Sequence, residues 1–249
     1  MEQSITELTK IWEEWINPKY SDLAYIVNLR QWYKNKDNET LLLKDFLHLD
    51  KAQAVSSCLR KINLYKPSYS LHWGKKNLEY KEVSKDIFYT AKEFERFGTH
   101  QIIPNLDDIF SNDSGLSEQE QHEMEKYINF IIGPIFRSWI SVVVSEQVNN
   151  NISCEIVNYK ENDFLAPHCD THDDRLIGIN FYLDPKWKDE YGGILGFKSE
   201  KEKLKLCKPL YNSISLIPIR DSYQHWVSPW KSKESGRYTV SMSFRPNNN

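Results

Sequence analysis

The spacing of hydrophobic positions divides the chain into two parts of different character. Residues 1 to about 145 carry mainly helical spacing, in which apolar side chains recur every three or four positions. From about residue 150, short apolar and aromatic runs alternate with turn residues, which is typical of β-strands. The pattern therefore predicts a helical first part followed by an antiparallel sandwich or barrel.

Start and stop signals place the helices of the first part. Ser117 is followed three positions later by Glu120, a capping-box pattern that predicts a helix running to about Phe130. Gly133 and Pro134 then interrupt the helical spacing. The expected helical segments are residues 5–16, 49–62, 117–130 and 136–144.

Six runs in the second part have the length and composition of strands. They are rich in β-branched and aromatic residues and are bounded by turn residues. Strands this short and this closely spaced form sandwiches or barrels. The expected strands are residues 152–159, 176–183, 193–197, 213–218, 225–227 and 238–244.

Composition and charge narrow the class of protein. The 249 residues carry a net charge of −3 with both signs intermixed, unlike the basic footprint of a nucleic-acid binder. The four cysteines form no CxxC pair and match no zinc module, so we expect reduced thiols. The N-terminus lacks the form of a signal peptide, and the apolar runs are too short to cross a bilayer. We therefore expect a cytoplasmic protein that binds neither nucleic acid nor membrane.

A His-x-Asp pair and a later histidine are the first candidates for chemistry. Residues two apart on an extended strand share a face, so His168 and Asp170 can reach one metal ion while Cys169 points away. Together with His225 they form a set of two histidines and one carboxylate. Such a set occupies one face of an octahedral ion and leaves open positions, as in non-haem Fe(II) oxygenases.

Arg237 follows these residues at the start of a predicted strand. Its guanidinium can pair with a carboxylate through two parallel hydrogen bonds. A dicarboxylate cosubstrate could chelate iron at one end and meet Arg237 at the other. Thr239 shares the strand face of Arg237 and offers a further hydroxyl donor.

In their order and spacing, these motifs resemble the 2-oxoglutarate- and Fe(II)-dependent dioxygenases of the prolyl-4-hydroxylase type. The resemblance covers residues from about 154 to 245, and the segment from residue 41 is similar to the opening strand and helix of that family. The resembling pieces are, in order, Tyr159, PHCD with His168 and Asp170, FYLDPKW ending at Trp187, GGILGF with Gly192 and Gly193, KPLYNSISLIPI around Asn212, HWVSP with His225, and GRYTVSMSF with Arg237.

The resemblance implies an α+β chain whose mainly β catalytic core is a double-stranded β-helix, or jelly roll, flanked by N-terminal helices. It implies a helical extension over residues 1–40 and a dioxygenase domain over residues 41–246, with the jelly-roll core at about 150–246. In this scheme the iron ligands are His168, Asp170 and His225.

The resemblance also assigns residues to the cosubstrate. Arg237 and Tyr182 match the residues that bind the distal carboxylate of 2-oxoglutarate, and Tyr159 matches a pocket tyrosine. Asn180 is expected on the face of Tyr182, and Val227 beside His225. The family usually has Asn where this chain has Asp184, a departure that we expect to affect a turn rather than catalysis.

A second His-x-Asp pair, His172 and Asp174, overlaps the first. The first pair is favoured because it follows Pro167 at the family-like interval from Tyr159. The residues just after Asp170 then form either a solvated loop or a rim that contacts substrate. His48, His72, His100 and His122 show no partner pattern and are expected to be structural.

The implied enzyme is a 2-oxoglutarate-dependent non-haem iron dioxygenase that hydroxylates an unactivated C–H bond and releases succinate and CO2. Its expected cofactors are Fe(II), 2-oxoglutarate and O2, with ascorbate as a stimulant. Related halogenases have Gly or Ala at the carboxylate position, so Asp170 favours hydroxylation over halogenation. Desaturation or cyclisation would need the same triad.

The long unmatched N-terminal half suggests a custom pocket wall, and on that ground we expect a small-molecule substrate, an amino acid or a natural-product intermediate, more than a peptide. One alternative is a hydroxylase of prolyl or other protein residues. Another is a non-catalytic metal-binding jelly-roll module, which the intact triad and Arg237 disfavour. The sequence does not indicate the oligomeric state.

Overall fold

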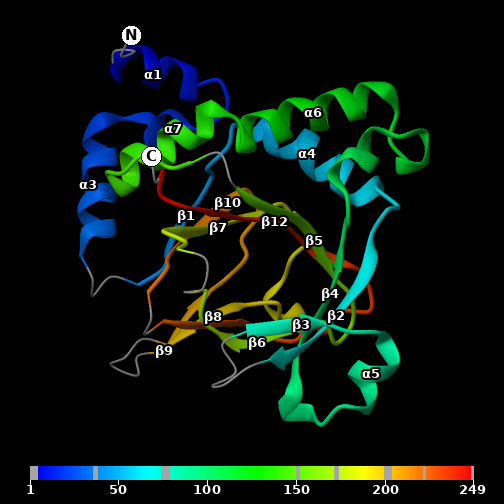
Figure 1. The fold of residues 1–249 in the computed structure, drawn as a ribbon. Helices are drawn as coiled ribbons and strands as arrows, with labels where there is room; N and C mark the ends of the chain where they lie inside the picture. Colours follow the sequence, from blue (N-terminus) through cyan, green and yellow to red (C-terminus); the bar gives the residue numbers. More distant parts are fainter. Residues whose placement is uncertain are drawn as a thin grey trace.

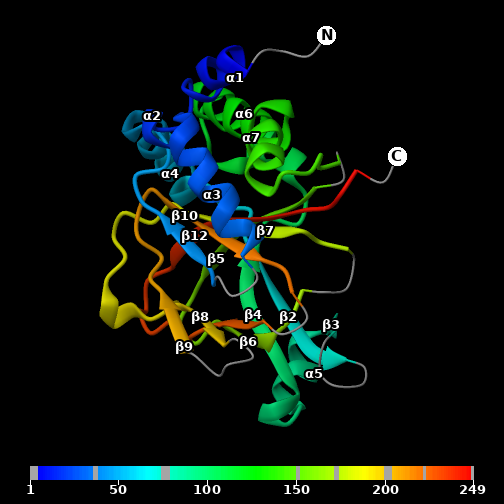
Figure 2. The ribbon, with the colours of Figure 1, turned by 90° about the vertical axis from the view of Figure 1, so that its left-hand side faces the viewer.

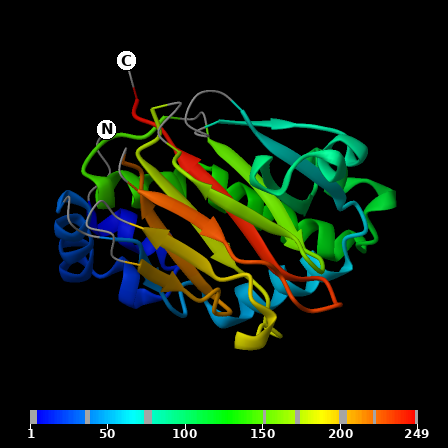
Figure 3. The same cartoon turned by 90° about the horizontal axis from the view of Figure 1, so that it is seen from below.

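The computed structural model describes residues 5–35, 39–73, 79–149, 152–170, 174–198, 204–220 and 223–247. Helices cover one face of an antiparallel sheet, and a smaller group of strands faces the other side (Figures 1 and 2). Seen from below, the strands lie in front and the helices lie behind them (Figure 3). This nearly closed barrel with N-terminal helices confirms the predicted jelly-roll architecture.

The barrel strands form one hydrogen-bonded path in the order β1-β10-β7-β12-β5-β4-β6-β11-β8-β9, and β2 joins β4 and β3 outside that path. Every pairing is antiparallel. The strands are β1 (Leu41–Leu43), β2 (Lys66–Trp73), β3 (Glu79–Glu82), β4 (Arg96–Ile102), β5 (Ser153–Tyr159), β6 (Phe164–His168), β7 (Ile177–Tyr182), β8 (Leu195–Lys198), β9 (Leu204–Cys207), β10 (Ser213–Pro218), β11 (Gln224–Val227) and β12 (Gly236–Phe244).

The capping box predicted at Ser117 is present. The backbone N–H of Ser117 donates to the carboxylate of Glu120 at 3.0 Å, and the N–H of Glu120 donates back to the Ser117 hydroxyl at 3.4 Å. The helices are α1 (Ile5–Trp12), α2 (Pro18–Ser21), α3 (Leu23–Lys34), α4 (Leu49–Lys61), α5 (Lys85–Thr90), α6 (Glu118–Ile132) and α7 (Pro134–Val144), and four short 3-10 helices lie at Glu93–Glu95, Leu106–Phe110, Asn112–Ser114 and Asp189–Tyr191.

Helices α6 and α7 follow one another with a break at Gly133, as the sequence predicted. By length and composition the combined stretch Glu118–Val144 could cross a membrane, but 56% of its most apolar window is buried inside the protein. Its aromatic side chains pack into the core: the ring of Phe136 lies 5.3 Å from that of Phe181 on β7. This stretch therefore forms the back layer of the fold.

Strand β12 shows how the fold separates core from cavity. Tyr238, Val240, Met242 and Phe244 belong to the main hydrophobic core between sheet and helices. The intervening residues Arg237, Thr239, Ser241 and Ser243 line a cavity inside the barrel. This alternation follows from the two-residue period of a strand. The same strand therefore presents a polar face to the cavity and an apolar face to the helices.

The prediction of a mainly helical first part is wrong between residues 66 and 102, where β2, β3 and β4 extend the sheet. The inward faces of these strands carry polar side chains, including Ser68, Ser70 and His100, which line the cavity. Strand β2 does alternate polar and apolar residues (KPSYSLHW), a strand signal that the sequence analysis did not use. Strand β4 (RFGTHQI) has no regular alternation, so its sequence gives no such signal.

Candidate active site

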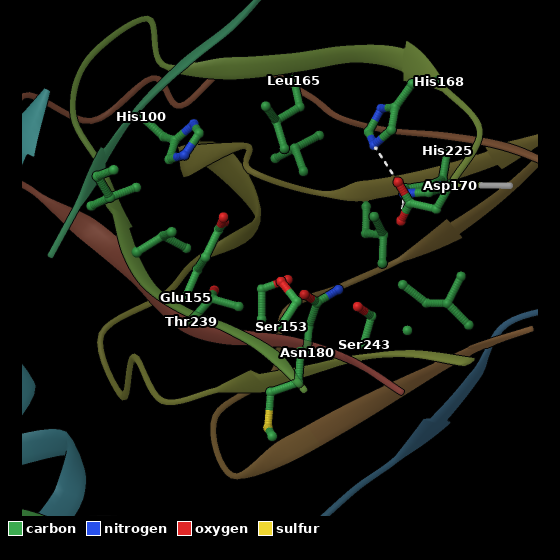
Figure 4. Close-up of a pocket in the computed structure, with 18 of the residues that line it drawn as sticks. His100, Ser153, Glu155, Leu165, His168, Asp170, Asn180, His225, Thr239 and Ser243 are labelled. Atoms are coloured by element: carbon green, nitrogen blue, oxygen red, sulfur yellow. Dashed lines mark ion pairs between the residues drawn. The ribbon is translucent and has the colours of Figure 1, made fainter. Parts of the chain in front are cut away.

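The three predicted metal ligands lie close together. His168 and His225 come from the neighbouring strands β6 and β11, and Asp170 lies just after β6. His168 ends β6 and pairs across the ladder with His225 on β11, and their rings lie 4.2 Å apart. Asp170 Oδ1 lies 3.8 Å from His168 Nε2, and its Oδ2 lies 3.5 Å from His225 Nε2. The three ligand atoms all lie within 4.8 Å of one another (Figure 4). One ion can therefore contact all three.

The two imidazoles are prepared to bind a cation. His168 Nδ1 lies 2.8 Å from the carbonyl oxygen of Ala166, to which it donates, so its Nε2 lone pair faces the other ligands. Burial, with the neighbouring His168, lowers the pKa of His225 to about 4. The ring of His225 is therefore neutral at physiological pH, as a metal ligand must be.

Arg237 places a buried positive charge in the same cavity. Its side chain is 3% exposed, Nε donates to the carbonyl of Gly193 at 2.6 Å, and Nη1 lies 3.5 Å from the Thr239 hydroxyl. Its guanidinium lies 4.7 Å from the centre of the Tyr159 ring. Among the residues that the structure describes, no carboxylate forms an ion pair with it. Because a buried charge is costly without a partner, the site fits an anionic ligand.

The remaining predicted cosubstrate residues divide into two groups. Tyr159, Thr239, Asn180 and Val227 line the cavity that the triad and Arg237 share. Tyr182 lies behind it: its hydroxyl pairs with the Ser215 hydroxyl at 3.1 Å, and its ring lies 5.5 Å from the guanidinium of Arg237. In this geometry Tyr182 supports the arginine rather than presenting its hydroxyl to the cavity.

His100 is a cavity residue that the sequence analysis assigned to a structural role. Its ring stacks on Tyr159, with 6.1 Å between ring centres, and its buried Nδ1 has no hydrogen-bond partner. Burial, with the nearby Arg237, lowers the pKa of His100 to about 4, so the ring is neutral. Nothing in the sequence marks this residue, because strand β4 brings it to Tyr159 from about sixty positions away.

Of the competing His-x-Asp pair, Asp174 is exposed and His172 lies outside the described residues. The rim expected after Asp170 is represented by Arg175, which lines the cavity with Nη1 at 3.6 Å from Asp170 Oδ1. The residue that departs from the family pattern, Asp184, accepts a hydrogen bond from the Lys186 N–H at 2.9 Å and so shapes the turn after β7.

The cavity has a volume of about 170 Å³, and the described residues that line it come from strands and from the segment after β6, with no contribution from a helix. The iron-ligand set and the arginine lie in this one space. A jelly roll with two histidines and a carboxylate beside a buried arginine defines the class of 2-oxoglutarate-dependent iron oxygenases.

Comparison with known proteins agrees with that class. Residues 154–245 match the model of the 2OG-Fe(II) oxygenase superfamily, which confirms the predicted resemblance for this part of the chain. The family, together with the triad, confirms the expected Fe(II), 2-oxoglutarate and O2. The residues present fit these groups, since two imidazoles and a carboxylate converge, and Arg237, which forms no ion pair with any described carboxylate, lines the same cavity.

One relative is the prolyl 3-hydroxylase OGFOD1 of Mus musculus, which is 29% identical over 115 residues. That match covers 44% of this chain but only 21% of the mouse protein. A Pseudomonas putida prolyl-4-hydroxylase shares the fold with a TM-score of 0.61 at 15% identity, covering 89% of this chain and 99% of its own. A Trichoplax adhaerens prolyl hydroxylase has a TM-score of 0.59 at 14% identity, covering 99% and 94%.

These relatives contradict the expectation that a small molecule is the more probable partner. OGFOD1 is a prolyl 3-hydroxylase, and the Trichoplax enzyme is bound to a peptide fragment of the hypoxia inducible factor. Part of the unmatched N-terminal half does form a cavity wall, because β2, β3 and β4 line the cavity, whereas its described helices contribute no lining residue. A wall that matches no family pattern therefore does not by itself distinguish a small-molecule substrate from a peptide.

Proposed function

We propose that this chain is an oxygenase that hydroxylates a prolyl residue of a protein or peptide. The observation that carries the reaction class is the convergence of His168, Asp170 and His225 within 4.8 Å in one cavity with the unpaired Arg237. The prolyl substrate is supported by the relatives, one of which is a prolyl 3-hydroxylase and another a prolyl hydroxylase bound to a peptide fragment. Because the chain spans about a fifth of the mouse relative, its substrate is part of the proposal.

His168, Asp170 and His225 would hold the ion, since their ligand atoms converge within 4.8 Å at the cavity. Iron with 2-oxoglutarate and O2 would supply the oxidising chemistry that converts a C–H bond to an alcohol, with succinate and CO2 as coproducts. His168, fixed by the Ala166 carbonyl, and the neutral His225 would donate nitrogen lone pairs. Asp170 would add the negative charge, which favours hydroxylation over halogenation.

Arg237 determines how the cosubstrate lies. Its guanidinium would meet the distal carboxylate. The Thr239 hydroxyl accepts from Arg237 Nη1 and donates to the Arg237 carbonyl at 2.9 Å, so it holds the guanidinium in place, and the ring of Tyr159 lies against it. His100 stays neutral and offers a ring N–H on the same side. These residues orient the keto acid end toward the iron ligands and keep water from the buried charge.

Two successive measurements test this function. Anaerobic addition of Fe(II) and 2-oxoglutarate to the protein should produce a visible charge-transfer band, which Asp170→Ala should abolish. A library of proline-containing peptides is then incubated in air and searched by mass spectrometry for an added oxygen on proline that matches succinate release. Absence of the band would refute the oxygenase site. A band with succinate release but no modified peptide would refute the prolyl substrate.

A further inference from the structure

Along β5, the residues that line the inner wall of the barrel change from aromatic and apolar to charged and polar. On β5 the cavity-lining residues are Tyr159, Val157, Glu155 and Ser153, every second position. Tyr159 lies at the level of Arg237, whereas Glu155 lies four residues further along, about 13 Å at the rise of a strand. A five-carbon cosubstrate anchored at Arg237 is shorter than this, so the Glu155 level belongs to the substrate.

Glu155 is part of a row of polar side chains across three strands. It pairs with Ser241 on β12, which in turn pairs with Asn180 on β7. All three line the cavity, and Glu155 lies with Ser153 and Asn180 on the wall opposite the metal ligands (Figure 4). The carboxylate of Glu155 forms no hydrogen bond or ion pair with any residue that the structure describes. It is therefore available to a ligand.

The surroundings of this carboxylate favour a cation. Glu155 is exposed to solvent on the cavity side, and partial desolvation by its surroundings raises the pKa of its carboxyl; Arg175 opposes that rise, and the nearby Glu82 and Asp170 add to it. Arg175 itself lies 3.6 Å from Asp170. The Glu82 carboxylate also lines the cavity and accepts a hydrogen bond from Ser68 at 3.2 Å. Two carboxylates thus border the substrate level of the cavity.

The net charge of the cavity with Fe(II) and 2-oxoglutarate bound also favours a cationic substrate. Among the residues that the structure describes, the charged residues that line it are three carboxylates, Glu82, Glu155 and Asp170, and two guanidiniums, Arg175 and Arg237. Among the histidines that line it, His100 is neutral at physiological pH, because burial lowers its pKa to about 4. A ferrous ion and a dianionic cosubstrate cancel one another. One negative charge is left for the substrate to neutralise.

We infer that Glu155 is a specificity-determining residue that selects substrates with a cationic side chain, Lys or Arg, close to the oxidised position. This inference rests on the proposed function, because the substrate is taken to be a prolyl peptide. A cationic side chain that follows the inner wall past the iron reaches the row of Glu155, Ser241 and Asn180. An acidic or apolar side chain at that place would leave the carboxylate unpaired and desolvated.

The test uses matched peptides with one proline in a neutral context and Lys, norleucine or Glu at each flanking position in turn. Binding to the protein loaded with Fe(II) and 2-oxoglutarate is measured without oxygen, and hydroxylation is measured in air. For at least one position, the Lys peptide should bind about tenfold more tightly than the norleucine peptide, as expected of one partly desolvated ion pair, and the Glu peptide most weakly.

Glu155→Gln should reduce that preference to nearly none, and Glu155→Lys should favour the Glu peptide, while both variants keep the wild-type affinity for 2-oxoglutarate. The matched control is Glu161→Gln, an exposed glutamate in the turn after β5, which should keep the Lys preference. Equal binding of the Lys and norleucine peptides, or a Lys preference that survives in Glu155→Gln, would overturn the inference.

The two proposals fail separately. Hydroxylation of proline without charge preference refutes the role of Glu155 and leaves the proposed function intact. Anaerobic binding with a Glu155-dependent Lys preference, but no hydroxylated proline in air, refutes the prolyl reaction and supports the cationic subsite.

Discussion

The carboxylate of Asp184 accepts a hydrogen bond from the backbone N–H of Arg237 at 2.9 Å. Arg237 has a φ of +48°, in the left-handed region that non-glycine residues seldom adopt, at a register shift in the pairing of β12 with β5. Asp184 is 5% exposed and also accepts from the Lys186 N–H. One buried side chain therefore both shapes a turn and holds the backbone that aims the guanidinium.

Replacement of Asp184 is expected to act on the cosubstrate through Arg237. Asp184→Ala leaves the buried N–H of Arg237 and the part-buried N–H of Lys186 without their acceptor and should destabilise the protein by about 2 kcal/mol, with a higher KM for 2-oxoglutarate. Asp184→Asn keeps an acceptor oxygen and should restore most of the affinity. Denaturant unfolding and cosubstrate titration measure the two effects. Equal KM values for Asp184→Ala and the wild type would show that the turn alone is affected.

Arg237→Ala is expected to weaken 2-oxoglutarate binding by roughly 30-fold or more, because the distal carboxylate would be buried without its charged partner. Arg237→Lys keeps the charge but loses the planar fork and should fall between the two. Anaerobic titration of the charge-transfer band gives the affinities, and iron binding without cosubstrate serves as the control. An unchanged affinity in Arg237→Ala would remove this residue from cosubstrate binding.

Asp170→Ala should abolish iron binding and oxidation while the fold persists, because the side chain lies at the cavity and outside the hydrophobic core. Asp174→Ala provides the matched control, since Asp174 is the exposed carboxylate of the competing His-x-Asp pair. It should bind iron like the wild type. Isothermal titration with Fe(II) and circular dichroism check both variants. Loss of iron binding in Asp174→Ala alone would assign the ligand to the second pair.

His100 is expected to contribute to acid sensitivity. Its pKa is lowered from 6.5 to about 4 in the folded protein, so between these pH values the unfolded chain binds a proton that the folded chain does not. Stability therefore falls as the pH decreases through this window, by on the order of 3 kcal/mol for this residue. His100→Phe should flatten the decline, which denaturant unfolding at pH 7 and pH 4.5 measures. Identical slopes for the two proteins would contradict the buried, neutral state of His100.

The same substitution tests the neighbouring anion site. His100→Phe retains an aromatic ring against Tyr159 but removes both ring nitrogens, so affinity for 2-oxoglutarate should decrease while iron binding is unchanged. His100→Gln keeps a hydrogen-bond donor and should bind the cosubstrate better than His100→Phe. Wild-type affinity in His100→Phe would restrict the residue to packing.

The strands of the second part could be predicted from the sequence because β5, β7, β10 and β12 have an apolar outer face that packs against the helices. The sequence did not reveal β4, whose buried polar residues are satisfied by a distant partner. Thr99 and Gln101 both donate to Asp163, at 3.1 and 3.3 Å. Such pairing depends on the tertiary fold, so local periodicity carries no trace of it.

For the site, His168 and Asp170 lie close together as their spacing suggested, but β6 ends at His168. The two-residue period of a strand therefore does not extend to Asp170, whose position depends on the segment after β6. Whether a side chain reaches the cavity or stops behind it depends on neighbours from other strands. Tyr182 pairs with Ser215 on β10, and His100 reaches Tyr159 from β4. The position of Glu155 opposite the metal ligands likewise requires the closed barrel.

The alternation along β12 gives the protein two independent sets of positions. Val240 and Phe244 pack in the core against the helical layer, whereas Ser241 and Ser243 line the cavity, and Met242 contributes to both. Substitution of the cavity-lining residues should alter substrate selectivity without disturbing the packing between the sheet and the helices. Laboratory evolution toward new substrates should therefore accumulate replacements at odd-numbered positions of this strand, with the even-numbered ones nearly invariant.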